Sequence, residues 1–203
     1  MKVLVIGSGA REHALVKSLG ADPEVDAVIV APGNPGMDAI ALCEALPGGM
    51  LDGPGIAALA GRHAVDLVVI GPEAPLVAGV ADAVRDEGFA VFGPSAEAAR
   101  LEGSKSFAKE VMAAADVPTA LARVCSTLDE VADALDALGA PHVVKDDGLA
   151  AGKGVVVTDD RDEALAHARS CLAKAGGTVV IEEYLDGPEV SLFCLCDGST
   201  VVP

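Results

Sequence analysis

The stretch VLVIGSGAREHAL, residues Val3–Leu15, places a glycine-rich turn between a short apolar run and the start of a helical segment. The run Lys2–Ile6 predicts a buried strand, and the segment from about Arg11 to Leu19 predicts a helix. A strand that passes through a tight turn into a helix is typical of parallel sheets with helices on both faces. The stretch therefore predicts an α/β fold for the first part of the chain.

The same alternation continues outward from this stretch. Further strands are expected at 25–31, 40–43, 66–70 and 90–92, and further helices at 54–63 and 75–87. Strands separated by helices of this length indicate a parallel sheet. We therefore expect one parallel-sheet domain over residues 1–103.

The pattern changes after this point. Ser104 is a suitable N-cap for a helix that reaches about Ala115, before Pro118. Beyond it, we expect strands at 120–125, 142–145, 154–158 and 178–183, helices at 127–138 and 160–173, and a hairpin of 190–196 with 200–202. Adjacent strands mixed with helices indicate an α+β arrangement.

Composition narrows the function classes. The 203 residues carry a net charge of −17, are 51% hydrophobic and only 2% aromatic. We expect no nucleic-acid binding, since no basic stripe is visible, and no membrane span, since no apolar run reaches ~18 residues. Five cysteines without a CxxC pair and four scattered histidines favour free thiols in a reducing compartment and predict no His or Cys metal site.

The first glycine turn is compatible with two interpretations. Gly7 and Gly9 match the first two glycines of a dinucleotide fingerprint, but Glu12 stands where the third belongs. The second strand also lacks the terminal acid that binds a ribose, which disfavours NAD and a Rossmann oxidoreductase. A smaller phosphate ligand, with Arg11 as its charge partner, and a turn without a ligand are equally compatible with the motif.

Two other loops follow strands of the same expected sheet, PGNPG at 32–36 and GPEAPL at 71–76. Loops at the carboxyl ends of parallel strands form the ligand crevice of such folds. Asn34 and Glu73 are suited to sugar hydroxyls or an amine. Turn chemistry alone explains the prolines of these loops but explains Glu73 less well.

The stretch KDDGLAAGKGVVV, residues 145–157, differs from a P-loop in its spacing. Three residues instead of four separate Gly148 from Gly152, and Gly154 replaces the hydroxyl residue that would hold magnesium. The β-branched run that follows predicts strand–loop–strand. The loop is then either an ordinary turn between two strands or a hairpin flap that closes over a triphosphate. In a flap, the glycine N–H groups would approach the phosphate oxygens, and Lys145 would lie beneath the same phosphates.

The stretch VVIEEYLDGPEVS, residues 179–191, is a strand that ends in acids. In a nucleotide site such a strand end can bind adenine through its main chain, and a later carboxylate can bind the ribose. An acidic strand end on an acidic protein is the alternative. The order of Lys105, Lys145 and Lys153 upstream favours the nucleotide site.

Together these residues resemble the glycinamide ribonucleotide synthetase family (phosphoribosylamine–glycine ligases) of the ATP-grasp superfamily. The matching stretches, in family order, are VIGSGAREHAL, APGNPG, VVIGPEAPL, VFGPSAEAARLEGSKSFAKEVM, VPTA, VVKDDGLAAGKGVVV and VVIEEYLDGPEVS. The resemblance implies an N-terminal α/β domain at 1–103, a connecting helix of the ATP-grasp core at 104–120, a lid subdomain at 121–188, and the first strands of a truncated core at 189–203.

The resemblance also implies a reaction. A cytoplasmic, monomeric ligase would join phosphoribosylamine to glycine in purine biosynthesis, using ATP and Mg²⁺, through a glycyl phosphate intermediate. The implied ATP-binding residues are Lys105, Lys145, Gly152, Lys153, Gly154, Glu182, Tyr184, Leu185 and Glu189. The implied substrate-binding residues are Gly7, Gly9, Arg11, Asn34, Gly36 and Glu73.

The sequence departs from the family pattern in two places. Asp146 stands where a small residue is expected, and the chain ends at Pro203, before the family's magnesium-binding carboxylate and Asn. We therefore expect an N-terminal fragment whose catalytic residues and metal ligands lie beyond Pro203, and no turnover by these residues alone. A catalytically incomplete module that binds nucleotide or sugar phosphate is the alternative.

Overall fold

The computed structural model describes residues 1–150 and 152–203, and the chain divides into two compact units. Unit 1 comprises Met1–Pro118 together with Asp146–Gly154, and unit 2 comprises Thr119–Lys145 together with Val155–Pro203. The loop of the expected flap thus belongs to unit 1. No helix within the described ranges has the length and apolar character needed to cross a membrane.

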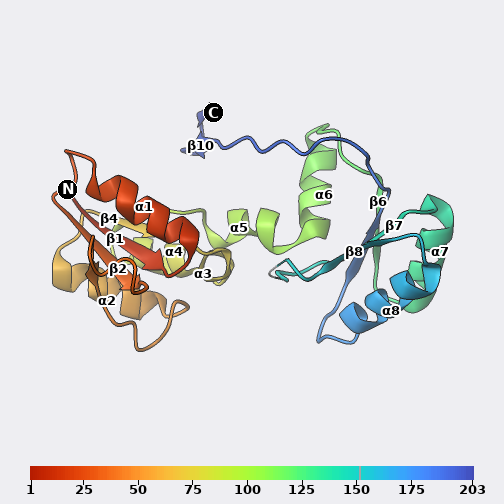
Figure 1. Cartoon of the computed structure of the whole chain (residues 1–203), viewed down its shortest axis with the longest axis horizontal. Helices are drawn as coiled ribbons and strands as arrows, with labels where there is room; N and C mark the ends of the chain where they lie inside the picture. The colour runs from red at the N-terminus through yellow and green to blue at the C-terminus, as the bar shows by residue number, and fades with distance from the viewer. Residues whose placement is uncertain (151) are drawn as a thin grey trace. The chain divides into compact units, whose positions relative to one another are not determined.

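A parallel sheet forms the centre of unit 1 (Figure 1). Its strands are β1 (Lys2–Gly7), β2 (Ala27–Pro32), β3 (Leu42–Cys43), β4 (Leu67–Ile70) and β5 (Ala90–Phe92). Their order is β3-β2-β1-β4-β5, and every neighbouring pair is parallel, which confirms the expected sheet. The chain changes direction across the sheet between β1 and β4, so the loops after these strands lie at a topological switch point, where ligands bind in such folds.

Helices cover both faces of this sheet, as the strand sequences predict (Figure 1). Unit 1 contains α1 (Ala10–Gly20), α2 (Gly53–His63), α3 (Glu73–Val77), α4 (Val80–Asp86), α5 (Ala96–Gly103) and α6 (Lys105–Ala114). Alternate residues of β1 point to opposite faces of the sheet. Val3 and Val5 pack with Val16 of α1 on one face. Leu4 and Ile6 pack with α2 and α4 on the other face. Because both faces are buried, the strand reads as an unbroken apolar run.

The single helix expected over 75–87 is wrong. The structure has two helices here, α3 and α4, which are separated at Ala78 and Gly79. Gly79 adopts a left-handed conformation with φ of +82°, and its N–H donates to the carbonyl of Leu76 at 3.0 Å. A left-handed glycine ends one helix and lets the next begin in a new direction. The apolar periodicity runs through the break, so periodicity alone predicted one helix.

Unit 2 contains a four-stranded sheet in the order β6-β9-β7-β8. Its elements are β6 (Ala122–Cys125), α7 (Leu128–Leu138), β7 (His142–Asp146), β8 (Val155–Thr158), α8 (Arg161–Leu172) and β9 (Val179–Glu182). The pairs β6–β9 and β7–β8 are antiparallel, which confirms both the α+β prediction and the strand–loop–strand reading of the flap. Side chains of α7 and α8 pack against Val144 and Ile181 of the sheet.

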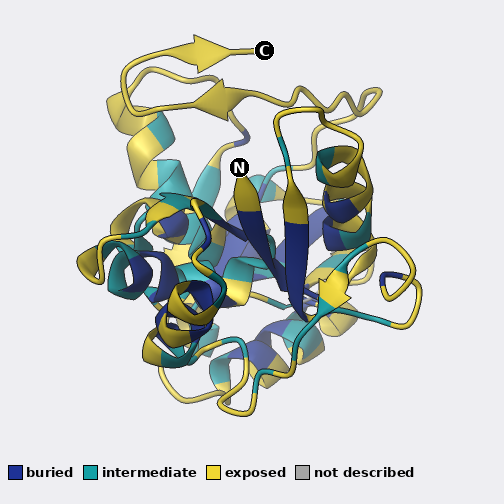
Figure 2. Ribbon diagram, turned by 90° about the vertical axis from the view of Figure 1, so that its left-hand side faces the viewer, coloured by how far each residue is buried: buried dark blue, intermediate teal, exposed yellow. Residues whose placement is uncertain are grey.

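The last segment of the chain forms a short antiparallel hairpin of β10 (Leu195–Cys196) and β11 (Val201–Val202). The hairpin agrees with the expectation, although its first strand is shorter than predicted. Figure 2 shows both strands exposed, in contrast to the buried centre of the parallel sheet. The turn between them is held by Asp197, whose carboxylate accepts the N–H groups of Ser199 and Thr200 at 2.9 and 2.7 Å.

The helix break at Gly79 predicts opposite effects of two Gly→Ala substitutions. Gly79→Ala should lower the free energy of unfolding by about 1 kcal/mol, because alanine disfavours a positive φ. Gly61→Ala, inside α2, should raise it by about 0.5–1 kcal/mol through helix propensity. A new Cβ finds its nearest neighbour at 3.7 Å in both positions, so sterics are matched. Urea denaturation measures both effects, and a stabilising Gly79→Ala would contradict the assigned conformation.

Candidate functional site

Three loops meet at the carboxyl edge of the parallel sheet, and the expected substrate-binding residues lie on them or at their ends. The loop after β1 is joined to the loop after β2, since the Gly33 N–H donates to the Gly7 carbonyl at 3.1 Å. The loop after β4 is joined to β1, since the Gly71 N–H donates to the Ile6 carbonyl at 3.1 Å. The structure thus brings the six expected substrate-binding residues onto one set of adjoining loops.

Glu12 lies at the centre of these loops, and its side chain is only 3% exposed. Its Oε2 accepts the N–H of Gly9 at 2.7 Å, so the carboxylate caps the N-terminus of α1 from within the helix. Its Oε1 is buried and has no hydrogen-bond partner among the described residues. In the sequence, Glu12 stands out only because it occupies the position of the fingerprint's third glycine, whereas in the structure it is the residue around which the loop folds.

Three glycines leave room for this carboxylate. A Cβ added to Gly7 or Gly71 would lie 2.7 Å from Cδ of Glu12, and one added to Gly9 would lie 2.8 Å from its Oε2. Real Cβ atoms do not approach other atoms this closely. The resemblance of the turn to a dinucleotide fingerprint therefore has a local cause, which is the space that Glu12 occupies.

Arg11 and Glu73 connect two of the loops. The Arg11 guanidinium donates to Glu73 Oε2 at 2.7 Å. The pKa of Glu73 is lowered, first by a hydrogen bond from its own backbone N–H at the start of α3 and then by Arg11. The hydrogen bond between Arg11 and Glu73 also raises the pKa of Arg11 above its usual value. Both side chains keep substantial exposure, so this pair can open toward a ligand.

Asn34 positions the loop after β2. Its side-chain amide donates to the Ser8 carbonyl at 2.9 Å, and its Oδ1 accepts the Gly36 N–H at 2.9 Å. A Cβ on Gly36 would lie 2.8 Å from the His13 ring, so this turn packs closely against α1. In the structure Asn34 and Gly36 are therefore parts of one hydrogen-bonded turn.

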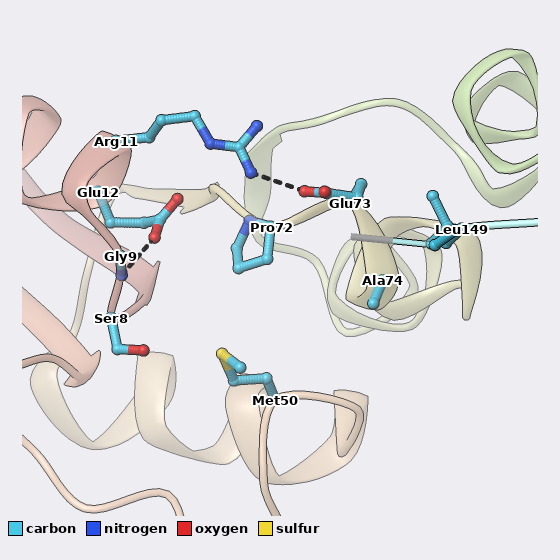
Figure 3. A pocket seen from close by; sticks show the side chains of 10 residues that line it. Ser8, Gly9, Arg11, Glu12, Met50, Pro72, Glu73, Ala74 and Leu149 are labelled. Atoms are coloured by element: carbon cyan, nitrogen blue, oxygen red, sulfur yellow. Dashed lines mark hydrogen bonds and ion pairs between the residues drawn. The ribbon is translucent and has the colours of Figure 1, made fainter. Parts of the chain in front are cut away.

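A pocket of about 420 Å³ opens between these loops (Figure 3). Its described lining consists of Ser8, Gly9, Arg11, Glu12, Met50, Pro72, Glu73, Ala74, Leu149 and Ala150. The lining combines the two loops at the switch point with the loop that follows β7 and with Met50, which lies between β3 and α2. The volume is large enough for a small-molecule ligand, and the mostly apolar lining carries a few charged side chains that could orient it.

The loop after β7 is fastened to the start of α6. The Lys105 ammonium donates to the carbonyls of Asp146 and Gly148 at 2.8 and 3.1 Å. The Asp147 carboxylate accepts the backbone N–H of Ser106 at 2.6 Å and its hydroxyl at 2.7 Å. Together these bonds form a latch, defined here as the contacts of residues 104–106 with residues 146–148.

The latch was not predicted from the sequence. Lys105 was expected to contact phosphate, and Asp147 was not singled out at all. About forty residues separate the two halves of the latch, so no local pattern reveals it. Beyond the latch, Gly152 has φ of +77°, Lys153 is exposed and Gly154 is buried.

Lys145 and Glu182 form an ion pair in unit 2, with Nζ and Oε2 2.8 Å apart. They stand on neighbouring strands, β7 and β9, and their side chains are 27% and 8% exposed. The structure thus joins a residue expected at phosphate to one expected at adenine. Tyr184, Leu185 and Glu189 follow β9 and are exposed.

The expected ATP-binding residues fit a polyphosphate in their chemistry. Ammonium groups and glycine N–H groups are the donors that bind phosphate oxygens, and the set contains three lysines and two glycines. The described residues do not offer a comparable set of ligands for magnesium. They contain no group of three or more His, Cys, Asp or Glu side chains that could hold a metal ion.

Comparisons with known proteins agree with this arrangement. A family profile described as "Phosphoribosylglycinamide synthetase, N domain" matches residues 1–102, and one described as "Phosphoribosylglycinamide synthetase, ATP-grasp (A) domain" matches residues 103–203. The chain is 63% identical over 203 residues to a phosphoribosylamine–glycine ligase of Streptomyces coelicolor, covering all of this chain and 47% of that protein. It is 57% identical to the ligase of Mycobacterium leprae, of which it covers 49%.

Solved structures show the same fold. The phosphoribosylamine–glycine ligase of Thermotoga maritima matches all of this chain and 48% of its own, with a TM-score of 0.82 and 29% identity. A carboxyaminoimidazole ribonucleotide synthase of Aspergillus clavatus, solved with ATP, matches 91% of this chain and 47% of its own, with a TM-score of 0.68 and 22% identity. The chain spans about half the length of the curated relatives it matches.

The latch predicts a local effect of removing Asp147. Asp147→Ala removes a charge-assisted acceptor from the N-terminus of α6, and such bonds contribute about 1.5–3 kcal/mol. The amides of Lys105 and Ser106, which donate to the Asp147 carbonyl and carboxylate, should then exchange hydrogen at least about tenfold faster. The exposed Asp159, replaced by alanine, is the matched control and should leave these rates unchanged. Unchanged exchange in Asp147→Ala would contradict the latch.

Proposed function

We propose that this chain, which belongs to the phosphoribosylglycinamide synthetase family, forms part of an ATP-dependent ligase that joins phosphoribosylamine to glycine. The strongest support is the 63% identity, along the whole chain, to the phosphoribosylamine–glycine ligase of Streptomyces coelicolor. The pocket around Glu12 supports the binding of a sugar phosphate, and Lys105, Lys145 and Lys153 support the binding of ATP.

The proposed reaction has two steps, a phosphoryl transfer and an acyl transfer. The glycine carboxylate attacks the γ-phosphorus of ATP, which forms glycyl phosphate and releases ADP. The amine of phosphoribosylamine then attacks the glycyl carbonyl, loses a proton and expels phosphate, which forms the amide bond. Electrostatic stabilisation of the transferred phosphoryl group is the main demand on the protein.

The ATP side of the proposal uses residues on and beside the loop after β7. We assign phosphate contacts to Lys105, Lys145 and Lys153 and to the N–H groups of Gly152 and Gly154. Adenine is assigned to Glu182 and the main chain of Tyr184 and Leu185, and the ribose to Glu189. In the structure Lys105 and Lys145 are held by protein acceptors. Phosphate oxygens would compete for the same N–H donors.

The sugar side of the proposal uses the pocket of unit 1. We assign phosphoribosylamine to the loop from Gly7 to Arg11, together with Asn34, Gly36 and Glu73. The exposed Arg11–Glu73 pair offers a cation for the sugar phosphate and a carboxylate for hydroxyl or amine groups. Mg²⁺, a monomeric state and a cytoplasmic location complete the proposal. The free cysteines of the described residues support a reducing compartment.

The assay is ADP release by the protein that contains this chain, with phosphoribosylamine generated from ribose 5-phosphate and ammonia. Release should require both glycine and the amine. Lys153→Met should lower kcat/KM for ATP at least about tenfold, since it removes a phosphate contact. Lys17→Met, an exposed lysine of α1, is the control and should have no effect.

Two results would contradict the proposed function. One is ADP release that needs neither glycine nor the amine. The other is a thermal-shift titration in which NAD raises the melting temperature while ATP with Mg²⁺ and ribose 5-phosphate do not, because a ligand of the native state stabilises it.

A further inference from the structure

The charged residues that line the pocket of unit 1 differ from those of a site that binds only anions. Among its described lining residues, Arg11 is positive and Glu12 and Glu73 are negative. Arg11 and Glu73 are 2.7 Å apart and compensate each other. The carboxylate of Glu12 therefore gives the pocket wall a net negative charge.

Glu12 is also the one pocket-lining residue with a buried oxygen that lacks a hydrogen-bond partner in the described structure. Only 3% of the residue is exposed, and one oxygen is engaged by Gly9. Figure 3 shows the side chain between the Gly9 loop and Pro72, with its second oxygen directed away from Gly9. A buried charged oxygen without a donor is costly, and a bound ligand can supply that donor.

The position of Glu12 makes a phosphate an unfavourable neighbour at this point. The N-terminus of a helix ordinarily attracts anions through its unpaired N–H groups. At α1 the Gly9 N–H is already engaged by the carboxylate, and a phosphate beside it would meet a like charge. The ligand group next to Glu12 should instead carry hydrogen-bond donors, and an amino group is the strongest candidate.

We propose that Glu12 recognises the amino group of a substrate bound in this pocket, through a hydrogen bond accepted by Oε1, while Oε2 keeps the Gly9 loop folded. The inference rests on the proposed function, in which phosphoribosylamine and glycine both carry an amino group. Glu12 then selects the amine over ribose 5-phosphate, which lacks it.

The test is Glu12→Gln in the full protein. Glutamine keeps an oxygen for the Gly9 N–H but replaces the free acceptor with an NH₂ donor. The KM for phosphoribosylamine should rise at least about tenfold, while the KM for ATP changes less than roughly twofold. The matched control is Glu130→Gln, because Glu130 has the same capping role at α7, where its Oε2 accepts the Thr127 N–H at 3.2 Å.

Each kinetic outcome has a distinct meaning. An increase in KM for glycine instead of phosphoribosylamine supports amino-group recognition and identifies glycine as its source. Unchanged KM values for both substrates overturn the role of Glu12 and leave the proposed function intact. Absence of glycine-dependent and amine-dependent ADP release in the wild-type protein overturns both.

A second measurement covers the case in which Glu12→Gln does not fold. In the wild-type protein labelled with ¹⁵N-glycine, the Gly9 amide resonance reports on its bond to Glu12. Glycine, ribose 5-phosphate, and ribose 5-phosphate with ammonia are added separately. A shift with glycine or with the ammonia mixture supports the proposal. Equal shifts with ribose 5-phosphate alone, or no shift in any arm, would overturn it.

Discussion

The buried carboxylate of Glu12 is the constraint on which the N-terminal site depends. It caps α1 through Gly9 and fills the space beside Gly7, the last residue of β1, and Gly71, which follows β4. These strands adjoin at the switch point of the sheet, so one side chain sets the relative position of the two loops that line the pocket. The cost of burying the charge is offset only in part by the Gly9 bond, and the remaining oxygen is the basis for ligand recognition.

A second carboxylate plays a comparable part in the other candidate site. Asp147 ties the start of the loop after β7 to the N-terminus of α6, where a negative charge is favourable. The Lys105 ammonium reinforces the same contact through two backbone carbonyls. In this acidic chain, two carboxylates thus hold the loops in place. Lysine ammonium groups and glycine N–H groups lie in or beside the same loops, and these are the donors that bind anionic ligands.

The sequence predicted the parts of the fold that depend on local patterns. Unbroken apolar runs marked the parallel strands, and Ser104 marked the start of α6, because each signal lies within a few residues. The break at Gly79 was missed, since glycine tolerates a helix interior as well as a left-handed turn. The roles of Glu12 and Asp147 could not be predicted, because they depend on Gly71 and Ser106, which only the tertiary fold brings close.

The most direct test of this account is a double-mutant cycle between Gly71 and Glu12. Gly71→Ala should destabilise the wild-type protein by about 1–3 kcal/mol, because the new Cβ overlaps the carboxylate. In the Glu12→Ala background the same substitution should cost much less, since the space is then empty. Free energies of unfolding for the four proteins would give a coupling of at least about 1 kcal/mol. Additive effects, within roughly 0.5 kcal/mol, would contradict the claim that the loops are shaped around Glu12.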